Sequence, residues 1–386
     1  MPRVLMYAKY ITPRYSGAGR QALSLASALR RHGVEVSFLT EATDDRPEDY
    51  ELDGFAVRTF FPATQSVSVQ PSRSRALTRV LREHRREPVV FHAHSAYPEA
   101  SAMGVSARMI GVPSILKVTL HRSDADCSGS RVIGRIHRQL LRRQSAIIAI
   151  SSEIRDELRE LGISPDRIRQ IPNGVDTERF RPADEAKRRE ARRALRLEPD
   201  RPMALFVGIL NARKNVHWLL DQWEARSDRT AVTLVLAGPA SEDPNDSIRQ
   251  RVERMSADEG SGVRWIGVQE RVEDVYAAAD LLILPSEAEG MPNVVLEAMA
   301  AGVPSLVTDG SGIRDLMGTV EQTMLPIRFG DADAFDEAIT LMTKELPGLR
   351  AVGAAARRRA EEVFSLDSVA LRYAELYSEL SRARVR

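Results

Sequence analysis

Two glutamates stand eight positions apart in the stretch EGMPNVVLEAMAAGVP, directly after the apolar run LLILPS. Pro292 suits the first turn of a helix, which places Glu297 inside that helix and Glu289 in the loop before it. The helix start offers N–H groups and a positive dipole end to a phosphate, and Gly290 permits close backbone approach. The two carboxylates can accept hydrogen bonds from sugar hydroxyls. The segment predicts a site for a sugar phosphate or a nucleotide sugar, although an ordinary helix start with two acidic residues would share this pattern.

A pair of cations follows another strand. In VGILNARKN a predicted strand ends at Gly208, and Arg213 and Lys214 follow several positions later. Cations at the carboxyl end of a strand can hold a diphosphate and stabilise the charge that grows when it leaves. Adjacent Arg and Lys residues are also common on ordinary surfaces, so the motif is weak by itself.

Two glycines, Gly17 and Gly19, stand at a predicted helix start in SGAGRQALSLA. GAGRQA matches the dinucleotide fingerprint G-x-G-x-x-A, and Glu41 ends the second strand about where a ribose-binding acid would lie. The fingerprint requires a tight turn directly after its strand, whereas the first strand here ends near Ala8. The dinucleotide interpretation is therefore the weaker one.

Histidines and paired aspartates are further candidates. His121 ends the strand SILKVTLH and can donate a hydrogen bond to a sugar hydroxyl or to an acceptor. His92 and His94 share one strand face, but no third metal ligand accompanies them, so a structural role is expected. The D-x-D triplets 124–126 and 331–333 resemble metal-binding carboxylates, and 331–333 fits a helix cap better. We expect no metal.

The elements that would position these residues alternate between short apolar strands and amphipathic helices. Strands are predicted at RVLMYA, VEVSFLT, PVVFHAH, SILKVTLH and SAIIAIS, and again at PMALFVG, VTLVLAGP, VRWIG, LLILPS and VPSLVTD. Runs of this kind are typical of parallel sheets covered on both faces. The turn cluster IPNGVDTERFRP suits a hinge. We expect two Rossmann-like doubly wound α/β domains at 1–178 and 179–364 that face each other across a cleft, and a helix at 365–386 that returns to the first.

Composition restricts the class of protein. The chain has 386 residues and no apolar run long enough for a membrane span. Its net charge of +1 disfavours nucleic acid as a partner. Its single cysteine, Cys127, cannot form an internal disulfide, and no signal peptide is evident, so we expect a cytoplasmic protein. Basic helices at 73–87 and 131–143 allow peripheral contact with the inner face of the membrane, although a solvated helix face is the more common explanation.

Together these motifs resemble glycosyltransferase family 4, the retaining enzymes of the GT-B fold. The resemblance covers nearly the whole chain and is carried by SGAGRQALSLASALRRHGVEV, IPNGVDTERFRP, VGILNARKN, LVLAGP, YAAADLLILPSEAEGMPNVVLEAMAAGVP and FSLDSVALRYAELY. The E-x7-E element in this context is the most specific of them.

The resemblance implies roles for individual residues. Glu289 would lie beside the donor sugar, Glu297 would bind the nucleotide ribose, and Arg213 and Lys214 would hold the diphosphate. His121 would be the active-site histidine of the first domain. Gly17 and Gly19 would approach the diphosphate from that domain, and the donor would also contact Gly208, Gly290, Met291, Pro292, Asn293 and Val294.

The sequence departs from the family at two places. Ile209 stands where the family often has an arginine after the glycine, and Met291 and Pro292 replace the common Phe-Gly. The first change removes one cation from the diphosphate site, so Arg213 would have to compensate more of the diphosphate charge. The second change leaves the helix start intact.

The reaction implied is transfer of a sugar from a UDP- or GDP-sugar to an acceptor hydroxyl, with retention and without metal or other cofactor. The acceptor is not identified by the sequence, and the basic helices are compatible with an anionic or lipid-linked one. A sugar-nucleotide epimerase, a phosphorylase and a non-catalytic nucleotide-binding relative of the same fold are the alternatives. An epimerase would release no sugar-linked product, and a phosphorylase would require inorganic phosphate.

Overall fold

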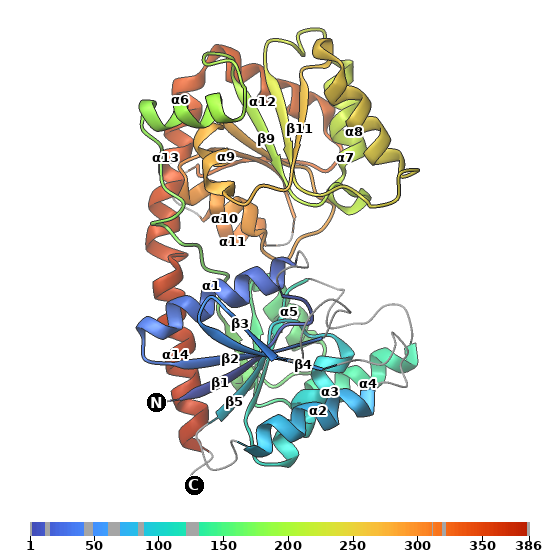
Figure 1. The fold of residues 1–386 in the computed structure, drawn as a ribbon, viewed down its shortest axis with the longest axis vertical. Helices are drawn as coiled ribbons and strands as arrows, with labels where there is room; N and C mark the ends of the chain where they lie inside the picture. Colours follow the sequence, from blue (N-terminus) through green and yellow to red (C-terminus); the bar gives the residue numbers. More distant parts are fainter. Residues whose placement is uncertain are drawn as a thin grey trace. The chain divides into compact units, whose positions relative to one another are not determined.

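The computed structural model describes residues 2–11, 16–41, 49–60, 70–83, 89–120, 131–310, 312–318 and 322–383. The chain forms two compact units, Met1–Gly174 together with Leu366–Arg386, and Val175–Ser365 (Figure 1). The change of unit thus falls between Gly174 and Val175, four residues before the boundary predicted after residue 178. The second unit begins and ends inside the first.

The first unit is built on an eight-stranded sheet in the order β3-β4-β2-β1-β5-β6-β7-β8. Neighbouring strands are parallel except for the antiparallel pair β3 and β4 at one edge. The central strands are buried along their length, as sheets covered on both faces require. The strands are β1 (Arg3–Tyr7), β2 (Glu35–Glu41), β3 (Asp49–Leu52), β4 (Phe55–Phe60), β5 (Val89–Ala93), β6 (Ser114–Val118), β7 (Ala146–Ala149) and β8 (Ile168–Gln170).

Helices pack against this sheet, and they include the last helix of the chain. Helix α14 belongs to the first unit and contacts α1 and β5. Its Tyr377 hydroxyl lies 2.7 Å from Nδ1 of His92 in β5, which fixes the helix against the strand. The helices are α1 (Gly17–Arg31), α2 (Gln70–Glu83), α3 (Pro98–Met109), α4 (Arg131–Leu141), α5 (Ser152–Glu160), the 3-10 turn η2 (Pro165–Arg167) and α14 (Leu366–Ala383).

The second unit is built on a six-stranded, fully parallel sheet in the order β11-β10-β9-β12-β13-β14. Its strands are β9 (Met203–Val207), β10 (Thr233–Ala237), β11 (Val263–Gly267), β12 (Leu281–Leu284), β13 (Ser305–Thr308) and β14 (Leu325–Ile327). Its helices are α6 (Glu185–Ala194), η3 (Ala212–Lys214), α7 (Val216–Ala225), α8 (Ser247–Ala257), η4 (Glu259–Ser261), α9 (Val272–Ala278), α10 (Asn293–Ala300), α11 (Ile313–Met317), α12 (Ala332–Lys344) and α13 (Leu346–Val363).

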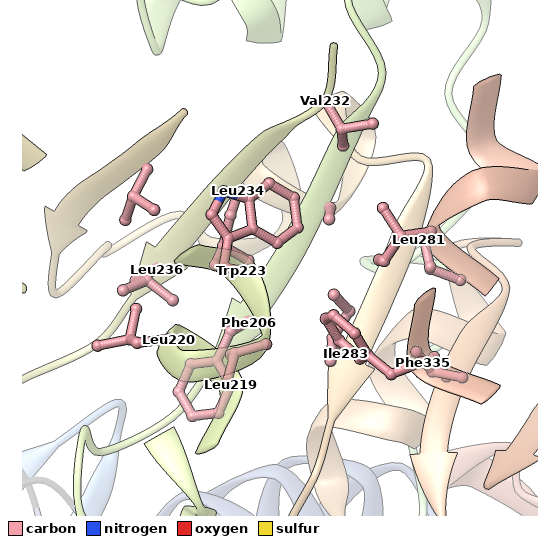
Figure 2. Packing of buried hydrophobic residues seen from close by; sticks show 14 of the residues in the cluster. Phe206, Leu219, Leu220, Trp223, Val232, Leu234, Leu236, Leu281, Ile283 and Phe335 are labelled. Carbon is pink, nitrogen blue, oxygen red and sulfur yellow. The ribbon is translucent and has the colours of Figure 1, made fainter. Parts of the chain in front are cut away.

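The core of the second unit lies between this sheet and its covering helices. Figure 2 shows Phe206, Leu234 and Ile283 of the sheet beside Trp223 of α7 and Phe335 of α12. These side chains are buried, and the Trp223 indole N–H donates to the Ser261 carbonyl, which satisfies its polar atom. The packed sheet gives the loops at its carboxyl edge a rigid base.

The two ends of the second unit are joined to each other. The N–H of Val175 donates to the carbonyl of Phe364 at 2.8 Å, and Val175 forms a parallel β-bridge with Ser365. Arg357 of α13 then donates to the carbonyls of Thr177 and Phe180, both at 2.8 Å. The segment that opens the unit is therefore fastened to the helix that closes it.

The expected fold class is confirmed, and each of the ten predicted strands is present. Four strands were not predicted from the sequence. Strand β3 has the polar sequence DYEL on an exposed edge, β4 pairs with it, and β8 and β14 are only three residues long. The polar strand β3 and the three-residue strands β8 and β14 carry too few apolar residues to give a strand pattern, whereas β4 alternates apolar and polar residues in FAVRTF and does have one.

Candidate active site

Two glycines bring the ends of β9 and β10 into backbone contact. Gly208 and Gly238 have φ of 152° and 140°, values that favour glycine. A Cβ atom on Gly238 would lie 2.0 Å from the Gly208 carbonyl oxygen. This contact fixes the start of the loop that carries Arg213 and Lys214. Gly238 was not among the predicted site residues, because only the folded structure shows which glycines touch.

The loop then forms a tight turn that separates its two cations. The side chain of Asn211 accepts from the N–H of Lys214 at 3.1 Å, and Asn215 adopts a left-handed conformation with φ of 55° before α7 begins. As a result Lys214 is buried, whereas the Arg213 side chain is 43% exposed.

Lys214 and Arg213 both contact Glu289. Nζ of Lys214 lies 2.5 Å from Oε1 of Glu289, and a guanidinium nitrogen of Arg213 lies 3.2 Å from the same oxygen. Arg213 also donates to the carbonyl of Ala288 at 3.0 Å, and the backbone N–H of Glu287 donates to the Arg213 carbonyl. The structure thus brings together three of the predicted catalytic residues from two loops of the second unit.

Gly290, the next residue, is held by a backbone contact with Gly312. Gly312 has φ of 74°, and a Cβ atom there would lie 1.9 Å from the Gly290 carbonyl oxygen. The loop before α10 is therefore packed against the loop after β13. Any side chain at Gly312 would push Gly290 out of place.

Helix α10 carries the second glutamate. Pro292 is the residue that caps this helix, with φ of −73° and no side-chain hydrogen bond, so the helix begins one residue later than predicted. Met291 and Pro292 are buried, and Asn293 and Val294 form the first turn. The half-buried Glu297 accepts from the Tyr276 hydroxyl at 2.9 Å. Glu289 and Glu297 thus have different partners.

Ile209 is exposed beside this cluster. It follows Gly208 directly and is 38% exposed, which is unusual for a large apolar side chain. Arg213 and Lys214 extend from the same loop to Glu289, so both cations of this loop reach the second loop of the site.

In the first unit, Gly17 and Gly19 begin α1. Gly17 is exposed, whereas Gly19 is buried, and a Cβ atom on Gly19 would lie 2.3 Å from the carbonyl oxygen of Tyr10. The N–H of Gly19 donates to the Ser16 hydroxyl at 3.2 Å, so this donor is satisfied within the helix cap. Gly19 therefore has a packing role whatever ligand approaches the helix.

His121 and the aspartates at 124 and 126 lie outside the described residues. Asp331 accepts from the N–H of Ala334 at 3.0 Å and caps α12, as its sequence indicates. In the described ranges, no group of three or more His, Cys, Asp or Glu side chains is arranged to hold a metal ion.

His92 and His94 are fully buried in the first unit, with ring centroids 4.3 Å apart. Burial, together with the nearby charge of Lys117, holds the pKa of both imidazoles well below the usual value. Burial also lowers the pKa of Lys117 to about 7. Tyr373 and Tyr377 of α14 lie against this cluster, and burial raises their pKa values. The sequence predicts a structural role for the two histidines, and nothing in the run SILKV indicates that Lys117 lies beside them.

The two parallel-sheet α/β units, with this constellation at the carboxyl edge of the second sheet, have the architecture of GT-B glycosyltransferases. Sequence comparison places the chain more narrowly. Residues 15–179 match Glycosyltransferase Family 4, and residues 201–345 match Glycosyl transferases group 1. The chain belongs to glycosyltransferase family 4.

Among its relatives is the "Putative teichuronic acid biosynthesis glycosyltransferase TuaC" of Bacillus subtilis (strain 168). It is 31% identical over 320 residues, which cover 80% of this chain and 77% of TuaC. The D-inositol 3-phosphate glycosyltransferase of Rhodococcus opacus (strain B4) is 28% identical over 378 residues, 89% of this chain and 82% of the relative.

Solved structures support the fold. Sucrose-phosphate synthase from Thermosynechococcus elongatus superposes with a TM-score of 0.82 at 21% identity, over 99% of this chain and 100% of that one. Anabaena Alr3699/HepE in complex with UDP superposes with a TM-score of 0.79 at 17% identity, over 98% and 100%. None of the helices in the described ranges is both long enough and apolar enough to cross a bilayer.

Proposed function

We propose that this glycosyltransferase moves a hexosyl group from a nucleoside diphosphate sugar to an acceptor hydroxyl, with retention at the anomeric carbon and without a metal. The observation that carries the proposal is the contact of Lys214 with Glu289 beside the loop that leads into α10. A buried ammonium, an exposed guanidinium and a helix start supply positive charge at one place, which suits a diphosphate leaving group.

The proposed residue roles follow from these positions. Lys214 and Arg213 would stabilise the departing diphosphate, and Glu289 would turn from them toward the donor sugar once the diphosphate occupies the cations. The half-buried carboxylate of Glu297 would accept hydrogen bonds from the ribose hydroxyls. The departing phosphate oxygen would take the acceptor proton, and the acceptor oxygen would attack the anomeric carbon from the same face.

The donor is proposed to be a UDP- or GDP-sugar. The fold is shared with a protein solved with UDP-glucose, and that neighbour superposes with a TM-score of 0.78. We therefore rank UDP-sugars first. The acceptor hydroxyl is left unassigned, because His121, a candidate contact of the acceptor, lies outside the described residues.

The proposal is tested by incubating the protein with UDP- and GDP-sugars and a mixture of glycan and polyol-phosphate acceptors, with and without excess chelator. The expected result is a sugar-linked product with the donor's anomeric configuration, formed at equal rates in both conditions. Proton NMR of the fresh product reads the configuration. Inversion, loss of turnover in chelator, or donor epimerisation without a linked product would each contradict the proposal.

A further inference from the structure

Tyr276 of α9 contacts the glutamate of α10 from the protein interior. Its hydroxyl lies 2.9 Å from Oε2 of Glu297 and 3.1 Å from the carbonyl oxygen of Val294. A phenol has one proton to donate, and the hydrogen bond to the carboxylate is the charge-assisted and stronger one. The carboxylate has about four lone-pair sites, so this bond does not exhaust its capacity to accept.

The tyrosine ring is fixed by its surroundings. Tyr276 is 1% exposed, and its ring packs edge-to-face against Phe180, with centroids 5.8 Å apart and planes at 81°. Phe180 is held in turn, because Arg357 donates to its carbonyl at 2.8 Å and the guanidinium of Arg179 lies 5.2 Å from its ring. The hydroxyl of Tyr276 therefore has little freedom to move away from Glu297.

We propose that Tyr276 is a positioning residue, which holds the carboxylate of Glu297 in the orientation that receives the donor ribose. The inference rests on the proposed function, since the ribose belongs to the nucleotide donor. A glutamate has three side-chain torsions, and ordering them costs free energy that binding must otherwise supply. The hydrogen bond from Tyr276 orders the side chain before the nucleotide arrives.

A merely structural tyrosine would behave differently from a positioning one. Loss of the hydroxyl would then change stability and leave the preference for ribose hydroxyls intact. If Tyr276 positions Glu297, loss of its hydroxyl should instead reduce the preference for ribose hydroxyls. The informative quantity is the ratio of the dissociation constants for a deoxy nucleotide and its parent nucleotide.

The experiment measures binding of UDP and GDP, and of their 2′-deoxy and 3′-deoxy counterparts, by calorimetry to wild type, Tyr276→Phe, Glu297→Gln and the double variant. For Tyr276→Phe we expect the preference for the ribose nucleotide to fall about tenfold, with unchanged affinity for the deoxy nucleotide that lacks the contacted hydroxyl. The double variant should lose no more of the preference for the ribose nucleotide than Glu297→Gln alone, because both changes remove the same interaction.

Tyr373→Phe is the matched control. It removes the hydroxyl of another fully buried tyrosine, one with no hydrogen-bond partner among the described residues, and it lies in the other unit. Nucleotide binding should match that of wild type. A wild-type ribose preference in Tyr276→Phe would overturn the positioning role and leave the proposed function standing. Failure of the wild-type protein to bind any of these nucleotides would overturn both.

Discussion

The ammonium of Lys214 lies 2.5 Å from a carboxylate oxygen of Glu289, a residue 75 positions further along the chain. Their side chains are only 11% and 13% exposed, so the buried ammonium depends on this carboxylate for compensation. A diphosphate that arrives at this lysine must compete with the glutamate for it. The contact therefore couples occupation of the cation site to release of the carboxylate.

Replacing Lys214 with alanine should lower kcat/KM by roughly 30- to 1000-fold, which corresponds to about 2 to 4 kcal/mol of transition-state stabilisation. The loss should appear mainly in kcat, because the charge on the leaving group grows in the transition state. Steady-state kinetics with the preferred donor measures it. Lys187→Ala, which removes an exposed ammonium in the same unit, serves as the control and should leave the rate unchanged. A wild-type rate for Lys214→Ala would remove this lysine from the mechanism.

Replacing Glu297 with alanine should instead weaken donor binding, by roughly ten- to a hundredfold, if its carboxylate accepts from the ribose. Turnover at saturating donor should change much less, because the ribose is remote from the reacting bond. Donor titration by calorimetry beside a kcat measurement separates the two effects. Unchanged donor affinity would contradict the ribose assignment.

Ile209→Arg should strengthen donor binding. The side chain at 209 is 38% exposed and follows Gly208 in the loop of the two cations, so a guanidinium there adds charge where the diphosphate is proposed to bind. We expect a roughly three- to tenfold lower KM for the donor, an effect that falls as salt is added. Ile209→Gln is the neutral control of similar length. An equal effect of both variants would indicate packing, and no effect of either would place the diphosphate elsewhere.

The buried cluster of His92, His94 and Lys117 should make folding stability depend on pH. The pKa values of all three are lower in the folded protein than in the unfolded chain, so the unfolded chain binds more protons. Stability should therefore rise with pH between about 7 and 10.5 through the lysine, and it should fall below about 6.5 as the histidines protonate on unfolding. Denaturant titrations at pH 5, 7 and 9 measure this dependence.

Lys117→Met tests the lysine contribution. The difference between a pKa of 10.5 and one of about 7 corresponds to roughly 5 kcal/mol, an upper limit for the gain from removing this ammonium at neutral pH. The variant should be more stable at pH 7 and should lose the rise toward pH 10. Lys344→Met, at an exposed position in α12, should change neither the stability at pH 7 nor its rise toward pH 10. A less stable Lys117→Met protein would mean that the ammonium has a compensating role.

Most of the fold and part of the site could be predicted from the sequence. The buried strands were readable because parallel strands are continuous apolar runs, and the grouping of Glu289 with Lys214 followed from strand ends that meet at one sheet edge. Tyr276 was missed because nothing in its own segment shows that its hydroxyl reaches Glu297, which is 21 residues away. Lys117 was missed because a lysine in the run SILKV gives no sign of being fully buried.

The pairing of Val175 with Phe364 and Ser365 has a consequence for how this enzyme can be dissected. Residues 175–365 have the form of a domain inserted into a host, since the chain enters and leaves at adjacent backbone positions. After excision at these points, the free ends would remain joined by the hydrogen bond from Val175 to Phe364. The fragment contains Arg213, Lys214, Glu289 and Glu297 with the tyrosine behind them. It should fold alone as a nucleotide-binding module. Conversely, a short linker that joins Gly174 to Leu366 would give the first unit without the second.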